Sequence, residues 1–475
     1  MAESTNAGHV RVGLITVMSE DSTWPESYIR KFEGNHAAAK EALLSLGFDV
    51  RTTAGDRLGR TFRQMAAQAS ELRGRGIDVL VLYVPDWSYS SNAVVGALNA
   101  GVPVIVWSDA HADQNGIVGA AIIRGGLDAV GVKTKLVRGL PEDPATRKKL
   151  GVLCRGIAAA TRLRNTKLGI GGGRSMGMYT AHVDPSELMK RFGVEIDFWE
   201  QVDLLQRARA YPEGEVKEML AWLAEEFGGI EAKGEVMDAQ VRMYLALRDL
   251  VKEKEYDAVC VKCLPELPAV YTTFCLAIAL FNDRSDHRGP KESTVCGCEA
   301  DINATLTMQM MKTLNGGPVM FTDVLKLYHE SNEIGMANCG SSATDFARSR
   351  KEVFWVKEGL REFDWRLGGT CPQYITRAGR ITMARLSRID GEYAMLIGGG
   401  ETVEYPREKL QEINPMHPQS YVRMDCSLDT FLEHLRCNHI HFVFGDFEKE
   451  LEIACWAMGI TPLVLPRRRG REGTP

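Results

Sequence analysis

Three short segments carry residue types that could bind a metal ion and move protons. Glu299 and Asp301 stand where an apolar helix is expected to begin, at residues 302–314. Asp323 ends a strand-like run, and His439 precedes another apolar run. Two carboxylates and an imidazole suit a hard divalent ion such as Mn²⁺ or Mg²⁺ that keeps open coordination positions. Plainer roles stay open, because an acid at a helix start can be an N-cap and an acid at a strand end can cap a turn.

A glycine-rich segment, residues 169–177, follows a predicted strand and precedes a predicted helix, which is the context of a phosphate-binding loop. The three-glycine dinucleotide pattern is not met, because Arg174 and Met176 stand where its last glycine would be. Asp197 follows at about the distance of a ribose-binding acid. The segment favours a tight strand-to-helix turn near a site, and a nucleotide-dependent oxidoreductase that uses Gly171–Gly177 stays an alternative.

Eleven cysteines, an odd number in a long chain, indicate free thiols in a reducing compartment. Two close pairs, Cys260 with Cys263 and Cys296 with Cys298, raise the question of a zinc ribbon. The second pair has the wrong spacing for a structural zinc site, and the first lies in a strand pattern, where cysteine is a common small buried side chain. We therefore expect no structural zinc and a cytoplasmic protein.

Composition narrows the possible partners. The 475 residues are 45% hydrophobic and 25% charged, which is ordinary globular usage, and the formal net charge is −5. Without a basic excess, nucleic acid is not an expected partner. The longest nearly apolar stretch, residues 269–281, is too short to span a bilayer, so no membrane association is expected. The first residues have no basic region followed by an apolar one, so no secretory signal is predicted.

The elements that must position these residues begin with an alternation of strands and helices. Such alternation predicts an α/β domain with a doubly wound parallel sheet, which places sites beyond the carboxyl ends of its strands. Predicted strands are residues 10–17, 49–53, 79–84 and 102–107, and predicted helices are residues 35–46, 61–73 and 92–99.

A second alternation of the same kind runs from residue 167 to residue 262. After residue 315 short alternating runs punctuated by glycines take over, which predicts a β-rich, barrel-like domain. The expected fold class is therefore α/β, with two doubly wound parallel-sheet domains followed by a β-rich C-terminal domain. The predicted domain boundaries are 1–165, 166–315 and 316–475.

Several of these segments together resemble L-fucose isomerase, and more loosely L-arabinose isomerase. The family's Glu-x-Asp at a helix start matches Glu299 and Asp301, its strand-end Asp-Val matches Asp323 at the same spacing of 24, and its Asn-His matches Asn438 and His439. The order of similar segments is kept from about residue 80 to residue 465. The other similar segments are residues 84–89, 168–177, 338–341 and 402–406.

The resemblance implies a fold of two α/β domains and a β-rich domain, and a Mn²⁺ ion, with Mg²⁺ or Co²⁺ as substitutes. Its ligands would be Glu299, Asp323 and His439. The two acids would also be the catalytic acid and base that interconvert an aldose and a ketose through a cis-enediol. Trp87 would pack on the sugar in the site of a neighbouring subunit, because the family's hexamers share active sites. Asn438 would contact the sugar or orient the histidine.

The resemblance also has departures that concern the substrate. Cys339 stands where the family has a serine, in the segment that ends with Ser341, and both are candidate substrate-binding residues. Lys262 stands near a family glutamine, and it or Arg174 could bind an anionic group. Either cation could equally be an ordinary surface or helix-capping charge. The chain is also more than a hundred residues shorter than typical L-fucose isomerases.

We therefore expect a metal-dependent aldose–ketose isomerase that acts on a free sugar and forms a homo-oligomer, a hexamer by resemblance. The substrate would be like L-fucose or D-arabinose, or a modified anionic hexose such as a sulfosugar. The alternatives are the nucleotide-dependent oxidoreductase and a non-catalytic sugar-binding protein. The second would need no paired acids with a histidine.

Overall fold

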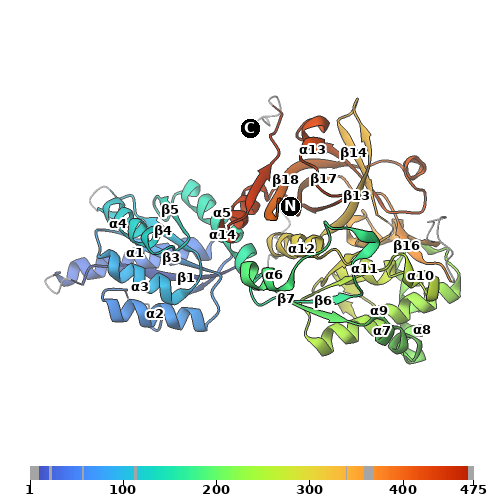
Figure 1. Cartoon of the computed structure of the whole chain (residues 1–475). Coiled ribbons are helices and arrows are strands. Elements are labelled where there is room, and N and C mark those ends of the chain that lie inside the picture. The colour runs from blue at the N-terminus through green and yellow to red at the C-terminus, as the bar shows by residue number, and fades with distance from the viewer. Residues whose placement is uncertain are drawn as a thin grey trace. The chain divides into compact units, whose positions relative to one another are not determined.

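The computed structural model describes residues 10–20, 24–55, 58–111, 115–338, 340–357 and 367–468. The chain divides into two compact units, which are described separately here (Figure 1). The N-terminal unit holds the chain up to Arg162 together with residues 449–457, and the main unit holds residues 163–448 and the chain from residue 458 on. None of the helices described is both long and apolar enough to cross a membrane.

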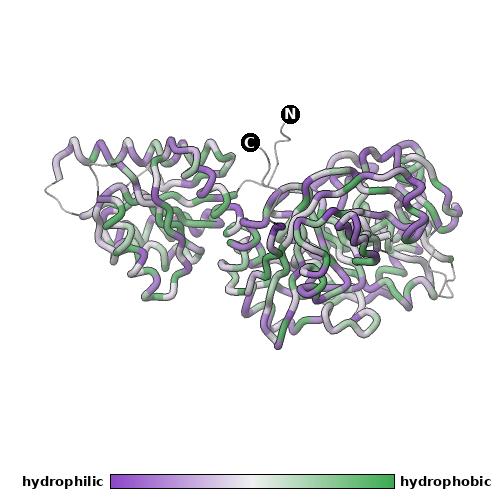
Figure 2. Tube along the Cα trace, turned by 90° about the horizontal axis from the view of Figure 1, so that it is seen from above, coloured by the Kyte–Doolittle hydropathy of each residue, from purple (hydrophilic) through white to green (hydrophobic). Residues whose placement is uncertain are grey.

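The N-terminal unit is a five-stranded sheet in the order β2-β1-β3-β4-β5, with every neighbouring pair parallel. Its strands read as continuous apolar runs because both faces are covered: α1 and α5 pack on one face, and α2, α3 and α4 on the other. Figure 2 shows hydrophobic segments in the interior of this unit. The strands are β1 (Arg11–Thr16), β2 (Asp49–Arg51), β3 (Val79–Val84), β4 (Val104–Ser108) and β5 (Thr134–Arg138); the helices are α1 (Glu26–Leu44), α2 (Phe62–Gly74), α3 (Ser90–Ala100), α4 (Gly116–Ala129) and α5 (Pro144–Thr161).

A helix from the end of the chain completes the N-terminal unit. Helix α14 (Glu448–Met458) lies against α5, so closely that a Cβ on Gly156 would stand 2.5 Å from the carbonyl oxygen of Glu450 (Figure 1). Arg155 adds an ion pair to the Glu450 carboxylate at 2.7 Å. The first and last parts of the chain are therefore bound into one α/β unit.

The main unit begins with a four-stranded parallel sheet in the order β12-β9-β6-β7. Its strands end at one edge, where the following loops gather. The strands are β6 (Lys167–Gly171), β7 (Glu195–Trp199), β9 (Ala258–Val261) and β12 (Val295–Cys298), and the helices are α6 (Pro185–Phe192), α7 (Gln201–Arg209), α8 (Glu213–Glu226), α9 (Gly234–Lys254), α10 (Glu266–Val270), α11 (Cys275–Asn282) and α12 (Ile302–Asn315).

The rest of the main unit is built on a seven-stranded sheet in the order β17-β20-β13-β14-β19-β18-β21. An additional antiparallel pairing of β17 with β18 closes its first six strands into a barrel. Closure leaves β21 as the added outer strand. The strands are β13 (Met320–Tyr328), β14 (Glu333–Ala337), β17 (Gly379–Ile389), β18 (Glu392–Val403), β19 (Gln419–Met424), β20 (His439–Phe444) and β21 (Thr461–Val464).

Smaller elements complete the main unit. A three-stranded sheet has the order β16-β15-β8, and β10 and β11 form a short hairpin. These elements are β8 (Gly229–Ile230), β10 (Ser285–Asp286), β11 (Gly289–Pro290), β15 (Phe354–Lys357), β16 (Thr370–Gln373), α13 (Leu428–His434) and the 3₁₀ helices η1 (Ser175–Gly177), η2 (Thr344–Phe346), η3 (Arg350–Glu352) and η4 (Arg407–Glu412).

Helix α12 joins the parallel sheet to the barrel. It contacts β9 and β12 of the sheet and β13, β17 and β20 of the barrel. Most of its residues are buried, because both neighbours cover it. The expected fold class, parallel α/β sheets followed by a β-rich barrel, is confirmed, and the domain boundaries at 165 and 315 stay predictions. Residues at the start of α12 therefore face the junction of the two layers.

A buried ion triad holds the N-terminal unit and yields a stability prediction. The Asp78 carboxylate accepts from the Arg11 backbone N–H at 2.8 Å and pairs with the side chains of Arg11 at 2.6 Å and Arg162 at 2.9 Å. Burial by itself would raise the pKa of Asp78, but the hydrogen bonds from the two arginines lower it below its ordinary value. The carboxylate therefore stabilises the fold at all pH values above its unfolded pKa.

We predict that Asp78→Ala lowers the free energy of unfolding of this unit by about 1.5–3 kcal/mol, the usual cost of losing hydrogen bonds to a charged group. In the wild type the same contribution should disappear as the pH falls through the lowered pKa of Asp78. Urea unfolding of the full chain measures both effects. The control is Asp128→Ala, which removes an exposed pair with Arg124 and should change stability by less than about 0.5 kcal/mol. Equal losses in the two variants would contradict the prediction.

Candidate active site

The two acids and the histidine singled out from the sequence come together in the main unit. Ligand atoms of Glu299, Asp323 and His439 all lie within 4.8 Å of one another. His439 Nε2 stands 3.2 Å from Glu299 Oε2 and 3.6 Å from Asp323 Oδ1. Asp323 and His439 face one another directly because β13 and β20 pair in that register. Three elements that are distant in sequence thus deliver two carboxylates and an imidazole to one point.

The backbone turns sharply to present Glu299. This residue follows β12, and both it and Ala300 have positive φ angles, 58° and 49°. Side chains other than glycine are rarely held there, at a cost on the order of 1–3 kcal/mol each, and such strain gathers at functional sites. The turn ends at Asp301, the N-cap of α12, so the start of the helix fixes where the glutamate stands.

Two buried polar atoms of the cluster support a metal ion. Glu299 Oε2 and His439 Nε2 are both buried and have no hydrogen-bond partner among the described residues. Buried polar atoms are nearly always satisfied, so a cation between them would supply the missing interaction. Carboxylate oxygens with one imidazole nitrogen are a donor set for Mn²⁺ or Mg²⁺. The residues present therefore fit the expected metal.

Two amides orient the second carboxylate. Asn338 donates to Asp323 Oδ2 at 2.7 Å, and Asn438 donates to Asp323 Oδ1 at 2.6 Å. The hydroxyl of buried Ser341 donates in turn to the Asn338 side-chain oxygen. Burial raises the pKa of Asp323 and Glu299 raises it further, against the opposite effect of His439. The expected contact of Asn438 with the sugar or the histidine stays a prediction, and in this structure its amide bonds Asp323.

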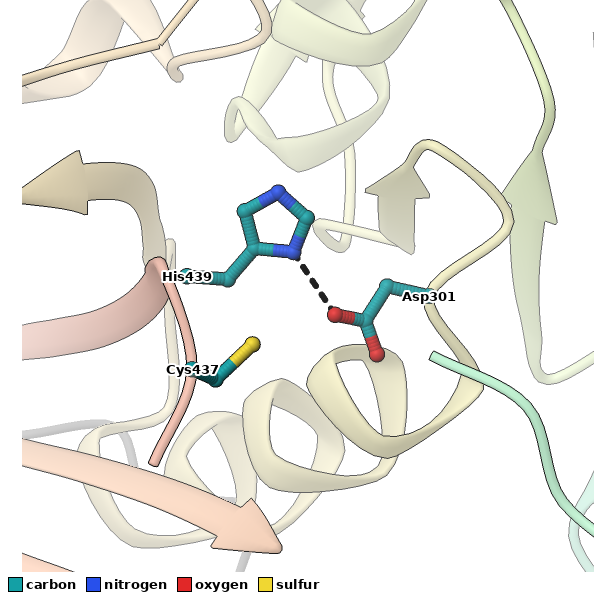
Figure 3. Close-up of side chains that lie close together, drawn as sticks. All are labelled: Asp301, Cys437 and His439. Carbon is teal, nitrogen blue, oxygen red and sulfur yellow. Dashed lines mark hydrogen bonds and ion pairs between the residues drawn. The ribbon is translucent and has the colours of Figure 1, made fainter. Parts of the chain in front are cut away.

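Beneath the cluster, the other nitrogen of the histidine meets Asp301. The distance from His439 Nδ1 to Asp301 Oδ2 is 2.7 Å (Figure 3). The buried guanidinium of Arg385 lies 2.8 Å from the same carboxylate oxygen. Burial alone would lower the pKa of His439, but the neighbouring carboxylates of Asp301 and Glu299 raise it well above the ordinary value. Sequence reasoning missed Arg385, although a single arginine inside the apolar run 381–386 was an available signal.

Lys262 stands at the same sheet edge as the glutamate. Val261 and Cys298 are register partners in the parallel pair β9–β12, so Lys262 and Glu299 are the next residues on adjacent strands. The Lys262 ammonium pairs with exposed Glu266 at 2.8 Å. Arg174 belongs to the loop after β6, one strand further along, and lies over the Tyr179 ring at 4.6 Å. Both candidate cations thus follow strands of the sheet that carries the glutamate.

The glycine-rich turn has a packing explanation. A Cβ on Gly169 would stand 2.5 Å from the Tyr256 ring, and one on Gly171 would stand 2.2 Å from the Trp199 ring. These glycines are needed because two aromatic rings cover the strand. Gly172 adds a positive φ of 87° where the chain turns. The geometry supports the tight turn expected from the sequence and offers no separate reason for a nucleotide.

Two other candidate residues were expected to contact the substrate. Trp87 lies in the N-terminal unit, in the loop after β3, and packs edge-on against Tyr89 with ring centroids 5.0 Å apart. Cys339 lies outside the described residues. The paired cysteines 260, 263, 296 and 298 belong to neither of the two groups of described residues that could hold a metal. The second of those groups is Asp301, Cys437 and His439.

Known proteins resemble the chain over most of this unit. Residues 336–464 match the family model of the L-fucose isomerase C-terminal domain. A sulfoquinovose isomerase of Alkalicoccus urumqiensis is 24% identical over 371 residues, which cover 74% of this chain and 77% of that protein. Another, of Clostridium sp. (strain MSTE9), is 26% identical over 298 residues, 62% of this chain and 64% of that protein. A third, of Priestia megaterium (strain ATCC 12872 / QMB1551), is 20% identical over 310 residues, 64% of this chain and 67% of that protein.

The family match includes the segment of Asn338 and the Asn438–His439 pair, and all three relatives are sugar isomerases by name. The order of motifs read from the sequence and these matches agree. The resemblance is therefore confirmed: the chain is similar to L-fucose isomerase in its C-terminal part and to sulfoquinovose isomerases over a larger part of its length, and it is an isomerase.

Proposed function

We propose that the chain is a divalent-metal-dependent isomerase that interconverts the aldose and ketose forms of an anionic hexose, with sulfoquinovose as the first candidate. The observation that carries the proposal is the cluster of Glu299, Asp323 and His439, in which two buried atoms lack a hydrogen-bond partner among the described residues. The relatives named sulfoquinovose isomerase give the substrate class. Neither a nucleotide-dependent oxidoreductase nor a non-catalytic binding protein accounts for this cluster.

Glu299, Asp323 and His439 would hold the ion. Mn²⁺ is the first choice and Mg²⁺ or Co²⁺ the substitutes. A divalent cation bound there supplies Lewis-acid stabilisation of negative charge on the substrate oxygens. The donor set of hard oxygens with one imidazole supports this assignment.

The same two acids would move the proton between C1 and C2. Isomerisation removes the hydrogen from the carbon next to the carbonyl and returns a hydrogen to the neighbouring carbon, through a cis-enediol. A carboxylate within reach of each carbon can take and give that proton. Asn338 and Asn438 each bond one oxygen of Asp323, so its carboxylate keeps one orientation during the transfer. Ser341 would act indirectly, by holding Asn338.

Lys262 would recognise the negative group of the sugar. Its side chain is mostly buried, and among the described residues its ion-pair partner is exposed Glu266. That glutamate can turn to solvent when a sulfonate binds the ammonium, in a charge-assisted hydrogen bond. Arg174 is the alternative anion ligand, from the neighbouring loop. A neutral sugar such as L-fucose or D-arabinose would offer no negative group for the Lys262 ammonium to bind.

The active form would be a homo-oligomer, a hexamer in which Trp87 completes the pocket of a neighbouring subunit. The N-terminal unit exposes large apolar side chains near this tryptophan, and monomers rarely expose such a patch. Helix α4 lies close beneath it, because a Cβ on Gly119 would stand 3.2 Å from the Trp87 Cα. The exposed residues are Trp87, Tyr89, Ile117, Val118 and Ile122.

The cytoplasm is the proposed compartment. The ten cysteines of the described residues are all buried, and none of them forms a disulfide with another described cysteine. Disulfides form where the environment is oxidising, so their absence among these residues supports a reducing one.

The substrate is tested with a panel of sulfoquinovose, L-fucose, D-arabinose and D-glucose, with Mn²⁺ present and ketose formation followed by NMR. We expect turnover of sulfoquinovose that a chelator abolishes. Lys262→Gln should lower kcat/KM for sulfoquinovose by about 10- to 100-fold, the loss of one charge-assisted hydrogen bond. The same change should leave any turnover of neutral sugars within about twofold, and Arg174→Gln tests the alternative anion ligand. Preference for a neutral sugar by the wild type would refute the anionic substrate.

Replacing each acid by its amide separates its role as a metal ligand from its role as a proton carrier. Glu299→Gln and Asp323→Asn keep an oxygen that can bind the ion but cannot accept a proton. We expect both to stay about 10²- to 10⁴-fold slow at saturating Mn²⁺. Deuterium from the solvent should enter the product of the wild type at C1 or C2. Rescue of both variants by excess Mn²⁺, with full retention of substrate hydrogen, would leave the acids as ligands only. The control is Glu392→Gln, an exposed partner of Arg191.

Sharing of the site is tested by mixing two impaired variants. Trp87→Ala should lower kcat/KM by about tenfold, the effect of losing roughly 1.4 kcal/mol of binding free energy. When Trp87→Ala and Glu299→Gln chains are unfolded together and refolded, hybrid assemblies should regain sites with both residues intact. Activity equal to the sum of the two separate variants, or an active monomer in sedimentation, would argue against a shared pocket.

A further inference from the structure

A buried chain of three charged or polar side chains runs beneath the metal-binding cluster: Arg385, Asp301 and His439. Each is at most 1% exposed. Arg385 Nη1 lies 2.8 Å from Asp301 Oδ2, and Arg385 Nη2 donates to Asp301 Oδ1 at 3.2 Å. Asp301 Oδ2 also stands 2.7 Å from His439 Nδ1 (Figure 3). A carboxylate at this depth is costly unless it is fully bonded, so its partners define its role.

Both oxygens of Asp301 are engaged as acceptors. Oδ1 accepts the backbone N–H of Ala304, as the N-cap of α12, and the second nitrogen of the arginine. Oδ2 faces the first nitrogen of the arginine and the imidazole. An ionised carboxylate can only accept hydrogen bonds, so His439 Nδ1 must carry a hydrogen. The lone pair of the neutral ring then lies on Nε2, which faces Glu299 and Asp323.

We propose that Asp301, which is paired with Arg385, is a positioning residue for His439. It holds the imidazole as the Nδ1–H tautomer and orients Nε2 toward the ion. The inference rests on the proposed function in one respect, that His439 is a metal ligand. Carboxylates that accept from the far nitrogen of a ligating histidine fix its tautomer and its ring orientation. Asp301 thus joins two tasks, because the same carboxylate starts the helix that follows Glu299.

The alternative interpretation of the side chains around Asp301 is a second metal site. Asp301, Cys437 and His439 are all buried and offer ligand atoms close together. An ion there would need the Nδ1 lone pair, which is occupied by the hydrogen donated to Asp301. It would also stand beside the Arg385 guanidinium, which already bonds both oxygens of the aspartate. The arginine is the cation of this cluster, so the metal belongs on the Nε2 side of the ring.

The test is the affinity of the metal-free full-length protein for Mn²⁺, followed by the EPR signal of the free ion. Asp301→Asn keeps the shape and a good N-cap, because asparagine caps helices as well as aspartate does. Its amide oxygen can serve either Ala304 N–H or His439 Nδ1–H, but the second position becomes a donor. We expect the Mn²⁺ dissociation constant to rise about 10- to 100-fold.

Two matched controls separate positioning from general damage. Asp184→Asn changes the N-cap of α6, which accepts the Glu187 N–H at 2.9 Å and is in neither group of residues that could hold a metal, so Mn²⁺ affinity should not change. Cys437→Ser should also leave it unchanged, whereas a second metal site would lose its ion. Pulsed EPR of the Mn²⁺ complex should show a coupled histidine nitrogen in the wild type and in both controls, and a weaker one in Asp301→Asn.

The outcomes are separable. A wild type that binds no divalent ion refutes the proposed function, and this inference with it. A wild type that binds Mn²⁺, with a folded Asp301→Asn of unchanged affinity and unchanged nitrogen coupling, refutes the positioning role alone. If Asp301→Asn does not fold, Arg385→Lys is the second variant. It keeps the positive charge but replaces the two-pronged guanidinium by a single ammonium. We expect it to weaken Mn²⁺ binding as well, by a smaller factor. Unchanged affinity in Arg385→Lys would then overturn the inference.

Discussion

Two carboxylates and an imidazole are held within 4.8 Å of one another in a place largely closed to water, and the main unit is arranged around that constraint. Negative charges at such distances repel strongly where the dielectric is low, and burial penalises each of them further. The direction of the Asp323 pKa expresses both effects. A divalent cation would reduce this repulsion. Hydrogen bonds from Asn338 and Asn438 also stabilise the Asp323 carboxylate.

The scaffold meets this constraint by bringing two layers together at the start of one helix. The parallel sheet delivers Glu299 through a strained turn, and the barrel delivers Asp323 and His439 on adjacent strands. Asp301 belongs to both arrangements, since it caps α12 and bonds the histidine. The neutralising charge comes from Arg385 on the next barrel strand, β17, which also pairs with β20. The order of the metal-binding cluster thus depends on the contact between layers.

In the proposed function, substrate recognition would fall to the carboxyl edge of the parallel sheet, apart from the barrel. Lys262 and the loop with Arg174 follow neighbouring strands of the sheet that carries Glu299. Loops can change without disturbing the strands that carry them, so specificity at this edge would vary independently of the candidate ligands on β13 and β20.

The sequence by itself determined the local elements and the candidates for chemistry. Apolar runs predicted β1 to β4 and the alternation that contains β6, β7 and β9, but not β5 or β12, and the segments of Glu299 and Asp323 pointed to candidate metal-binding acids. The local pattern was less informative where packing decides the start of a helix. Helix α1 begins at Glu26, nine residues before the predicted start. The reason is that Phe32 and its aromatic neighbours Trp24 and Tyr28 pack into a small core of their own. Only the tertiary structure decided three other features. These are the closure of the barrel, the register that places Asp323 opposite His439, and the burial of Arg385 against Asp301. Periodicity reports which face of an element is apolar, whereas strand register and ion pairing join residues more than eighty positions apart and depend on the packing of all the layers between them.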